Sequence, residues 1–270
     1  MKNTKEKLLK LSLFLFVAIL GVFIWSCSDS TSPEETQGQI LIKMVDNPAD
    51  YDEVNIAVSR VEVHKAESDS NSGWFVINST PAVYDLLTLR NGASVVLGNK
   101  SLDAGHYSQI RLIIGTGSNI VVDGNFYNLT IPSGVQSGIK LNHAFEIEAG
   151  NIYELMLDFD VDHSIVKTGN SEYKLKPVIR LVPTIISGTI SGTINPITSF
   201  ATVSAIKGLD TVSTYADLAT GSFKIMALLE GTYSVNVIPT NLLFEETTIQ
   251  NVIVTAKQNT DLSTINLQVK

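Results

Sequence analysis

The residues with the clearest capacity for chemistry are six carboxylates that alternate with apolar residues along one stretch of the chain. A three-residue loop at 149–151 would fold residues 144–162 into a hairpin in which the two sets of side chains occupy opposite faces. The apolar face would hold Phe145, Ile147, Tyr153, Leu155, Leu157, Phe159 and Val161. The acidic face would hold Glu146, Glu148, Glu154, Asp158, Asp160 and Asp162.

Carboxylates crowded on one face repel one another unless a cation neutralises them, and calcium, which takes six to eight oxygen ligands, is the natural candidate. The spacing is not that of an EF-hand, because the loop glycine and the closing Glu are missing. The alternative, which is the commoner outcome, is a solvated face in which Lys174 and Lys176 pair with Asp158 or Asp160. Calcium is thus the only cofactor that the sequence suggests, and its candidate ligands are Glu146, Glu148, Asp158, Asp160 and Asp162.

Residues typical of nucleophilic catalysis are present, but not in a catalytic arrangement. Ser137 and Lys140 match an S-x-x-K motif and residues 167–169 match K-T-G, yet a strand-like context replaces the buried helix that this chemistry needs. The histidines are scattered, without the spacing of a metal-binding pair: His64, His106, His143 and His163. We therefore expect no catalytic residues and a protein that is not an enzyme, with a hydrolase as the least favoured alternative.

One aromatic residue and one loop are candidates for ligand binding. Trp74 is the only tryptophan beyond the amino-terminal segment and adjoins a polar loop, where it could stack on a sugar or anchor a partner. The alternative is a core residue that closes one end of a sandwich. The Ser/Gly loop at 132–138 is either a recognition loop or a flexible connection. The candidate ligand-binding residues are Trp74, Ser133 in this loop and Lys140 just beyond it.

The start of the chain has the pattern of a lipoprotein signal. A basic segment at residues 2–10 precedes an apolar run, Leu11 to Trp25, that is shorter than the roughly 20 residues of a membrane-spanning helix. Small Ser26 directly precedes Cys27, the only cysteine, which fits cleavage before Cys27 and lipid attachment to its thiol. A single cysteine in an exported protein has no internal disulfide partner. The alternative is an uncleaved signal anchor.

Composition limits the partners and the location. The formal net charge is -8, and the amino-terminal segment is itself basic, so the mature chain is more acidic still. An acidic surface repels phosphate backbones and argues against nucleic acid as a partner. We expect the membrane, through the lipid anchor, and a glycan or an envelope protein as partners. The expected location is the cell envelope, facing the periplasm or at the outer-membrane surface.

The elements that must position these residues are strands. Val, Ile, Thr and Ser are abundant, aromatic residues make up 7% of the chain, and apolar residues recur with period two. Only residues 83–89 could form a short helix. A break near Pro183 divides the chain, and the motif at 105–108 recurs at 231–234, each a glycine turn that launches a strand beginning with an aromatic residue.

The expected fold class is all-β, with two β-sandwich domains in tandem after a lipoprotein signal peptide. The expected segments are a signal peptide at 1–26, a tether at 27–37, a first sandwich at 38–184 and a second at 185–270. Strands are expected at 40–45, 54–58, 61–64, from Trp74, and at 108–114, 120–122, 126–131, 144–148, 153–161, 173–175 and 178–182. In the second sandwich they are expected at 186–194, 201–206, 222–226, 233–238, 249–255 and 261–267.

The first sandwich resembles a family of bacterial and archaeal envelope proteins whose domain is catalogued as of unknown function. The motifs that carry the resemblance, in order, are Asp46-Asn47-Pro48, Gly73-Trp74, Asp85-Leu86-Leu87, residues 105–112, Pro132-Ser133-Gly134, Gly138-Ile139-Lys140-Leu141, Leu157-Asp158-Phe159-Asp160 and Leu175-Lys176-Pro177-Val178. The resemblance covers about residues 38–183. It implies an exported, often lipid-anchored, β-rich protein, and it brings no catalytic residues.

The second sandwich resembles the carboxypeptidase-regulatory or transthyretin-like domain, which is often grouped with starch-binding-like folds. Its motifs are Gly192-Thr193-Ile194, Thr220-Gly221-Ser222-Phe223 and residues 229–235. This resemblance implies a spacer or stabiliser, and the absence of tryptophan beyond Trp74 argues against sugar stacking there. The sequence as a whole predicts a non-enzymatic, lipid-anchored envelope protein that acts as a recognition or structural module. The alternative is a calcium-assisted carbohydrate-binding lipoprotein.

Overall fold

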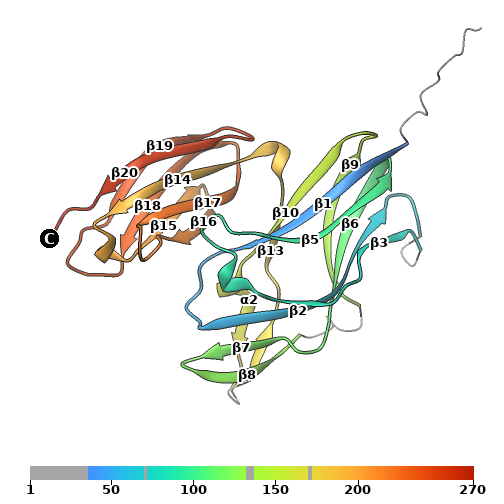
Figure 1. Cartoon of the computed structure of the whole chain (residues 1–270), viewed down its shortest axis with the longest axis horizontal. Helices are drawn as coiled ribbons and strands as arrows, with labels where there is room; N and C mark the ends of the chain where they lie inside the picture. Colours follow the sequence, from blue (N-terminus) through green and yellow to red (C-terminus); the bar gives the residue numbers. More distant parts are fainter. Residues whose placement is uncertain (1–35, 70–71, 132–136, 170–171) are drawn as a thin grey trace, which may run out of the picture. The chain divides into compact units, whose positions relative to one another are not determined.

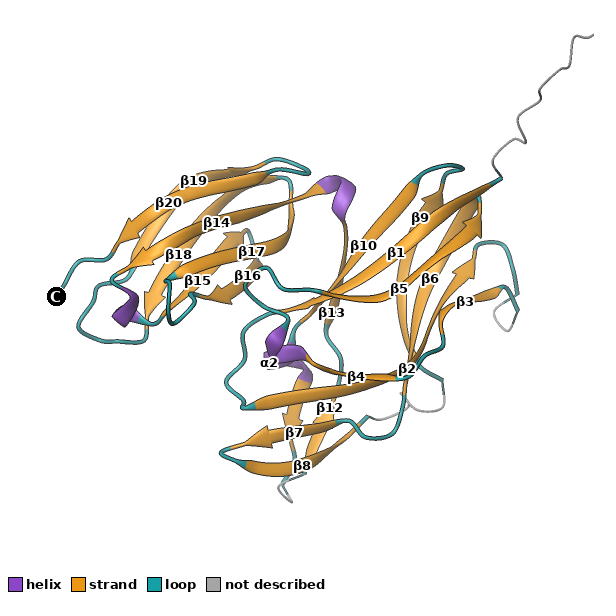
Figure 2. Cartoon of the chain, in the orientation of Figure 1, coloured by secondary structure: helices purple, strands orange, loops and turns teal. Residues whose placement is uncertain are grey.

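Alternating apolar and polar residues form strands over most of the described chain, which confirms the all-β fold class (Figure 1, Figure 2). The computed structural model describes residues 36–69, 72–131, 137–169 and 172–270. Within these ranges, no helix is long and apolar enough to cross a membrane.

The strands that precede residue 184 are β1 (Gln37–Asp46), β2 (Glu53–Lys65), β3 (Trp74–Asn78), β4 (Ala82–Asp85), β5 (Val95–Asp103), β6 (Gly105–Ile114), β7 (Asn119–Val122), β8 (Asn125–Thr130), β9 (Ile139–Ile147), β10 (Ile152–Phe159), β11 (Ile165–Lys167), β12 (Tyr173–Leu175) and β13 (Ile179–Pro183). The later strands are β14 (Ser187–Asn195), β15 (Ala201–Lys207), β16 (Asp210–Tyr215), β17 (Ser222–Leu229), β18 (Gly231–Pro239), β19 (Thr247–Val254) and β20 (Asn259–Asn266). The helical turns are η1 (Leu86–Thr88), α2 (Val161–Ser164), η2 (Thr184–Ile186) and η3 (Ile197–Ser199).

Strands β1 to β13 form two sheets. One has the order β13-β10-β1-β5, and its central pair β1–β10 is parallel. The other has the order β11-β12-β8-β7-β2-β6-β9, with β3 and β4 also paired to β2. Strand β2 is long enough to pair with β7 and then with β6, and with β4 and then with β3. The sheet therefore places β3 and β6 beside the same stretch of β2.

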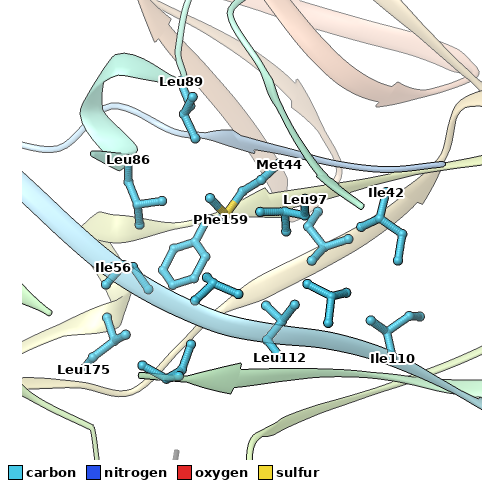
Figure 3. Packing of buried hydrophobic residues seen from close by; sticks show 14 of the residues in the cluster. Ile42, Met44, Ile56, Leu86, Leu89, Leu97, Ile110, Leu112, Phe159 and Leu175 are labelled. Carbon is cyan, nitrogen blue, oxygen red and sulfur yellow. The ribbon is translucent and has the colours of Figure 1, made fainter. Parts of the chain in front are cut away.

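The core lies between these two sheets (Figure 3). Alternate residues of each strand point into it, and Phe159 from β10 contributes one of its largest fully buried side chains. Strand β10 is buried on both sides, because Met156 joins a small separate cluster with Val45, Val182 and Ala227. This second cluster contains residues from both halves of the chain.

The later strands form a second pair of sheets with a core of their own. The orders are β17-β14-β20 and β16-β15-β18-β19, and the core between them holds residues from Ile190 to Leu267. No strand between Thr36 and Lys270 belongs to sheets of both halves among the described residues, although Thr36–Lys270 pack together as one structural unit. The division into domains at residues 184 and 185 stays a prediction.

The motif that recurs in the sequence has the same local structure at both sites. Gly105 and Gly231 begin β6 and β18 with φ of 136° and 143°, values at which a side chain would strain the backbone. Two residues later, the buried Tyr107 donates its hydroxyl proton to the Asp103 carbonyl at 3.0 Å. Tyr233 donates to the Leu229 carbonyl at 2.7 Å in the same way. Each tyrosine can be buried because its hydroxyl reaches a carbonyl four residues earlier.

The hairpin expected at residues 144–162 is wrong. Strand β9 pairs with β6 in the nine-stranded sheet, whereas β10 pairs with β1 and β13 in the four-stranded sheet. The turn at 148–151 therefore carries the chain from one sheet to the other. The expected apolar alternation is correct, since all seven apolar residues are buried or half-buried.

Other differences are smaller. Strands β4, β5, β11 and β16 are not among the predicted strands, and the helix considered for residues 83–89 is the end of β4 followed by the single turn η1. Strand β5 contains Gly98, Asn99 and Lys100, which interrupt the apolar pattern. As the edge strand of its sheet, β5 needs a regular apolar face less than a central strand does.

Replacing Phe159 with Ala should lower the free energy of unfolding by about 3–5 kcal/mol, because it removes a buried ring and leaves a cavity. Urea unfolding of the full chain measures this loss. Phe126→Ala is the matched control, since Phe126 is 64% exposed and its loss should change the stability by about 0.5 kcal/mol or less. Equal effects of the two substitutions would contradict the described core.

Candidate functional site

The nine-stranded sheet gathers aromatic and cationic side chains on its outer face. Adjacent strands β3, β2, β6 and β9 place Trp74 opposite His64, Glu62 opposite Arg111, and Arg111 opposite Lys140. Because side chains alternate between the faces of a strand, these residues point away from the core. We call the group Trp74, Arg111 and Lys140, with Glu62 and His64 beneath them, the Trp74 platform.

Arg111 is held against the indole ring of Trp74. Its guanidinium carbon lies 3.9 Å from the centroid of the Trp74 ring, and Nζ of Lys140 lies 5.9 Å from the same centroid. Trp74 is half-buried and is not a member of the hydrophobic core cluster. A cation this close to an aromatic face is attracted by the ring electrons, so the contact fixes both side chains.

A buried carboxylate holds Arg111 from the other side. Nε of Arg111 donates to Oε2 of Glu62 at 2.6 Å, and Nη2 of Arg111 also contacts this oxygen. Nε of Arg60 lies 2.8 Å from Oε1 of Glu62. The Glu62 side chain is only 5% exposed, and two guanidinium groups offset the loss of its hydration.

His64 supports the platform from below. Its ring meets Trp74 edge-on, with centroids 4.9 Å apart, and Nε2 lies 3.1 Å from the Asp69 carbonyl oxygen. A carbonyl can only accept, so Nε2 donates to it, and Nδ1 shares a hydrogen bond with the Ser108 hydroxyl at 3.2 Å. Both ring nitrogens are thus engaged, and the histidine joins β2 to β6 and to the loop before Trp74.

A glycine allows the chain that enters β9 to lie against Arg111. Gly138 has a φ of 72°, and a Cβ there would lie 2.8 Å from Cγ of Arg111 and 2.6 Å from Cδ1 of Ile113. A side chain at this position would displace the arginine.

The structure brings two of the three predicted ligand-binding residues together. Trp74 and Lys140 lie on one face, while Ser133 and the predicted lipidation site Cys27 lie outside the described residues. Arg111 was missed as a site residue, although it occurs in one of the family motifs. The signal that could have found it is its outward position in β6, between the buried Ile110 and Leu112.

The five predicted calcium ligands do not share a face. Glu146 is exposed on β9, and Glu148 accepts a hydrogen bond from Asn151 in the following turn. Asp158 lies in β10 of the four-stranded sheet, Asp160 is the N-cap of α2, and Asp162 lies within α2. Across residues 36–69, 72–131, 137–169 and 172–270, no group of three or more His, Cys, Asp or Glu side chains could hold a metal ion. Calcium binding stays a prediction, but the acidic face from which it was inferred does not form.

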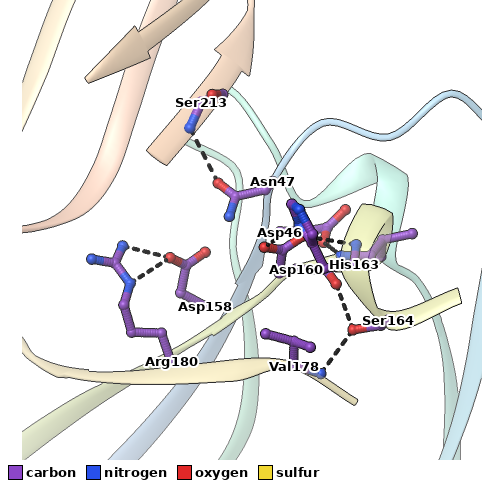
Figure 4. A network of polar contacts seen from close by, with 10 residues as sticks. Asp46, Asn47, Asp158, Asp160, His163, Ser164, Val178, Arg180 and Ser213 are labelled. Atoms are coloured by element: carbon purple, nitrogen blue, oxygen red, sulfur yellow. Dashed lines mark hydrogen bonds and ion pairs between the residues drawn. The ribbon is translucent and has the colours of Figure 1, made fainter. Parts of the chain in front are cut away.

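Two of these residues, Asp158 and Asp160, instead belong to a polar network at the end of β10 (Figure 4). The buried Asp158 accepts from Nη2 of Arg180 at 2.6 Å and from Nε at 3.1 Å. Asp160 caps α2 and accepts from Nδ1 of His163 at 2.9 Å, which raises the pKa of His163. Asn47 accepts from the backbone N–H of Ser213 at 3.3 Å and so joins the network to β16.

Asp46, which was not among the predicted calcium ligands, lies near Asp158 and Asp160 and has no cationic partner among the described residues. Its Oδ1 accepts from the backbone N–H of Val161 at 3.3 Å, and its Oδ2 has no described hydrogen-bond partner. Burial raises the pKa of Asp46 to about 9, and the nearby charges of Asp158 and Asp160 add to the shift. The carboxyl is therefore neutral in the folded protein at pH 7.

Replacing Asp46 with Asn should remove a pH dependence of stability. With a folded pKa of about 9 and an unfolded pKa of about 4, Asp46 holds a proton in the folded state that the unfolded state has released. The stabilisation is complete below the lower value and is lost as the pH rises through the higher one. The free energy of unfolding should therefore fall by up to about 1.4 kcal/mol per pH unit between them.

Urea unfolding of the wild type and of Asp46→Asn at pH 6 and pH 8.5 measures the effect as a difference. The variant should gain stability relative to the wild type as the pH rises. Parallel pH profiles for the two proteins would contradict a protonated, buried Asp46.

Comparison with known proteins identifies one family. The model of a family described as "Domain of unknown function (DUF4382)" matches residues 37–177, close to the range 38–183 expected from the sequence motifs. No curated protein matches the chain.

Several solved structures resemble the chain. A type II cohesin–X-dockerin complex from Acetivibrio cellulolyticus matches 30% of this chain and 58% of its own, at 30% identity and a TM-score of 0.25. The Bacillus anthracis TIE protein matches 87% of this chain and 34% of its own, at 12% identity and a TM-score of 0.25. The minor pilin GBS52 of Streptococcus agalactiae matches 86% and 96%, at 13% identity and a TM-score of 0.23. The chain thus spans less than two thirds of the first two, and these TM-scores support no inference about function.

Proposed function

The chain belongs to the family described as "Domain of unknown function (DUF4382)", and we propose that it is a non-enzymatic recognition module of the cell envelope that binds a glycan on the Trp74 platform. The carrying observation is the contact of Trp74 with two cationic side chains on the outer face of one sheet. The matched residues 37–177 include every residue of this platform.

The polar groups of the platform favour binding over catalysis. His64 is buried and both of its ring nitrogens are engaged, so it is poorly placed to shuttle protons. The only described acid beneath the platform, Glu62, is held by Arg60 and Arg111 instead of orienting His64. These contacts fix a surface rather than activate the Ser108 hydroxyl.

Attachment to the envelope is proposed from the sequence. A basic segment, an apolar run of limited length and Cys27 after a small residue fit a lipoprotein signal. Acyl chains contribute roughly 0.8 kcal/mol per buried CH₂ group, so two or more would hold the protein at a membrane. A lipid at Cys27 would tether the sandwich near the start of β1, leaving the Trp74 platform on a folded unit outside the bilayer.

Replacing Cys27 with Ala should release the protein from the membrane fraction and abolish incorporation of a labelled fatty acid. Cell fractionation and metabolic labelling measure the two effects. Ser28→Ala is the matched control and should behave like the wild type, because it leaves the thiol in place. If the Cys27→Ala variant still incorporated the labelled fatty acid and stayed in the membrane fraction, lipidation at this residue would be contradicted.

Removal of the indole should abolish glycan retention. The full chain, purified in detergent, is passed over a panel of immobilised envelope and environmental polysaccharides, with calcium or with a chelator. Trp74→Ala should weaken retention about tenfold or more, since it removes the ring against which Arg111 and Lys140 are held. Phe126→Ala, which removes an exposed ring on β8, should have no effect.

The same assay separates the alternatives. Retention that disappears with the chelator would support the calcium-assisted hypothesis. Failure of the wild type to bind any polysaccharide, or equal retention of Trp74→Ala, would contradict glycan binding at this face and direct the search to envelope proteins as partners.

A further inference from the structure

We propose that the glycan bound by the Trp74 platform is acidic, and that Arg111 and Lys140 hold its carboxylate or sulfate groups. This inference rests on the proposed function, because it assigns the ligand class of the same face. It differs from the expectation drawn from the sequence, in which Trp74 itself stacks on a sugar ring.

A sugar cannot stack directly on the face of the Trp74 ring that Arg111 covers. A separation of 3.9 Å between the guanidinium carbon and the ring centroid is direct contact. A sugar could stack on that face only after Arg111 moved away, which would break its hydrogen bond to the buried Glu62. Leaving that carboxylate with one partner fewer is unfavourable. Trp74 is therefore the support for Arg111, and the guanidinium is the surface offered to the ligand.

Arg111 retains donors for an anion. A guanidinium has five N–H groups in a rigid plane, and the bonds to Glu62 use Nε and Nη2. Nη1 makes no hydrogen bond or ion pair with any of the described residues. The side chain is 19% exposed, so a ligand reaches its outer edge while the inner edge stays fixed. A preorganised guanidinium of this kind suits planar carboxylates and sulfates.

Lys140 supplies a second cation beside the same ring. Its side chain is exposed on β9, and no ion pair of Lys140 is formed within the described ranges. Glu62 offsets only one of the charges of Arg60, Arg111 and Lys140, so the platform is locally cationic. This occurs in a chain whose formal net charge is -8. A polyanion would be repelled elsewhere, so its binding must be local to the platform and sensitive to salt.

Neutral hydrogen-bonding groups in the next row favour a saccharide. Gln109 donates from Nε2 to Oδ1 of Asn142 at 3.0 Å, on the strands that carry Arg111 and Lys140. The bond orients both amides and leaves the Asn142 amide N–H groups and the Gln109 carbonyl for other partners. Hydroxyl groups that flank each acidic group of a polysaccharide match this row of donors and acceptors.

The test compares two acidic polymers, each with its neutral counterpart. Binding of the full chain in detergent is measured by titration with polygalacturonate, with its methyl ester, with dextran sulfate and with dextran. Polygalacturonate and dextran sulfate should both bind. The polymer that binds more tightly identifies carboxylate or sulfate as the preferred group. The two neutral polymers should bind at least about tenfold more weakly, because they lack the charge-assisted hydrogen bonds.

Variants assign the binding to the platform. Lys140→Gln should weaken binding of the acid polymer about tenfold, whereas Lys176→Gln, which removes the same charge from an exposed residue on another part of the first sandwich, should leave it unchanged. Arg111→Lys keeps the positive charge but loses the planar set of guanidinium donors, and it should also weaken binding. Circular dichroism and unfolding of Arg111→Lys check that the fold survives.

The outcomes distinguish this inference from the function on which it rests. Equal binding of acid and neutral polymers, or equal effects of Lys140→Gln and Lys176→Gln, would overturn the acidic-ligand inference and leave glycan recognition intact. Binding of none of the four polymers, with none retained in the wider panel, would overturn both.

Discussion

The Trp74 platform depends on the need of strand β2 to pair its backbone groups while most of its residues are buried. An unpaired backbone group in a protein interior costs about 1–3 kcal/mol, so each stretch of this 13-residue strand requires neighbours. Strands β7, β6, β4 and β3 supply them in turn. Because β3 and β6 flank the same part of β2, the pairing that satisfies the backbone also brings Trp74 and Arg111 together across it.

Burial of acidic side chains is handled in two ways in this protein. Glu62 is placed between two guanidinium groups, and Asp158 has the guanidinium of Arg180. Asp46 has no cation within the described part of the chain, and its burial shifts the pKa to about 9. The difference is the presence of an opposing cation: burial raises the pKa of Asp158 while Arg180 lowers it, whereas no cation opposes the effect of burial on the pKa of Asp46.

The sequence could predict which residues are buried better than which residues are neighbours. Period-two alternation correctly assigns the apolar residues on both sides of the 148–151 turn, yet it could not say that β9 and β10 belong to different sheets. Alternation specifies the face of a strand and not its partner, so a short turn between two strands predicts a hairpin whether or not they pair. The contact of Arg111 with Trp74 was out of reach for the same reason, since it requires the order of β3, β2 and β6. The motif that recurs at residues 105–108 and 231–234 could be recognised because its glycine, its tyrosine and the carbonyl that accepts from the tyrosine lie within a few residues of one another.

The position of β1 has a mechanical consequence. This strand starts at Gln37 and is bonded along both edges, in parallel to β10 and antiparallel to β5. Tension applied to the chain before Gln37 runs along the strand axis, so the hydrogen bonds of both ladders bear the load together, in shear. An edge strand pulled sideways would peel away one bond at a time under a smaller force. Entry through an interior strand therefore makes the first sandwich resistant to force at the end where a tether would pull.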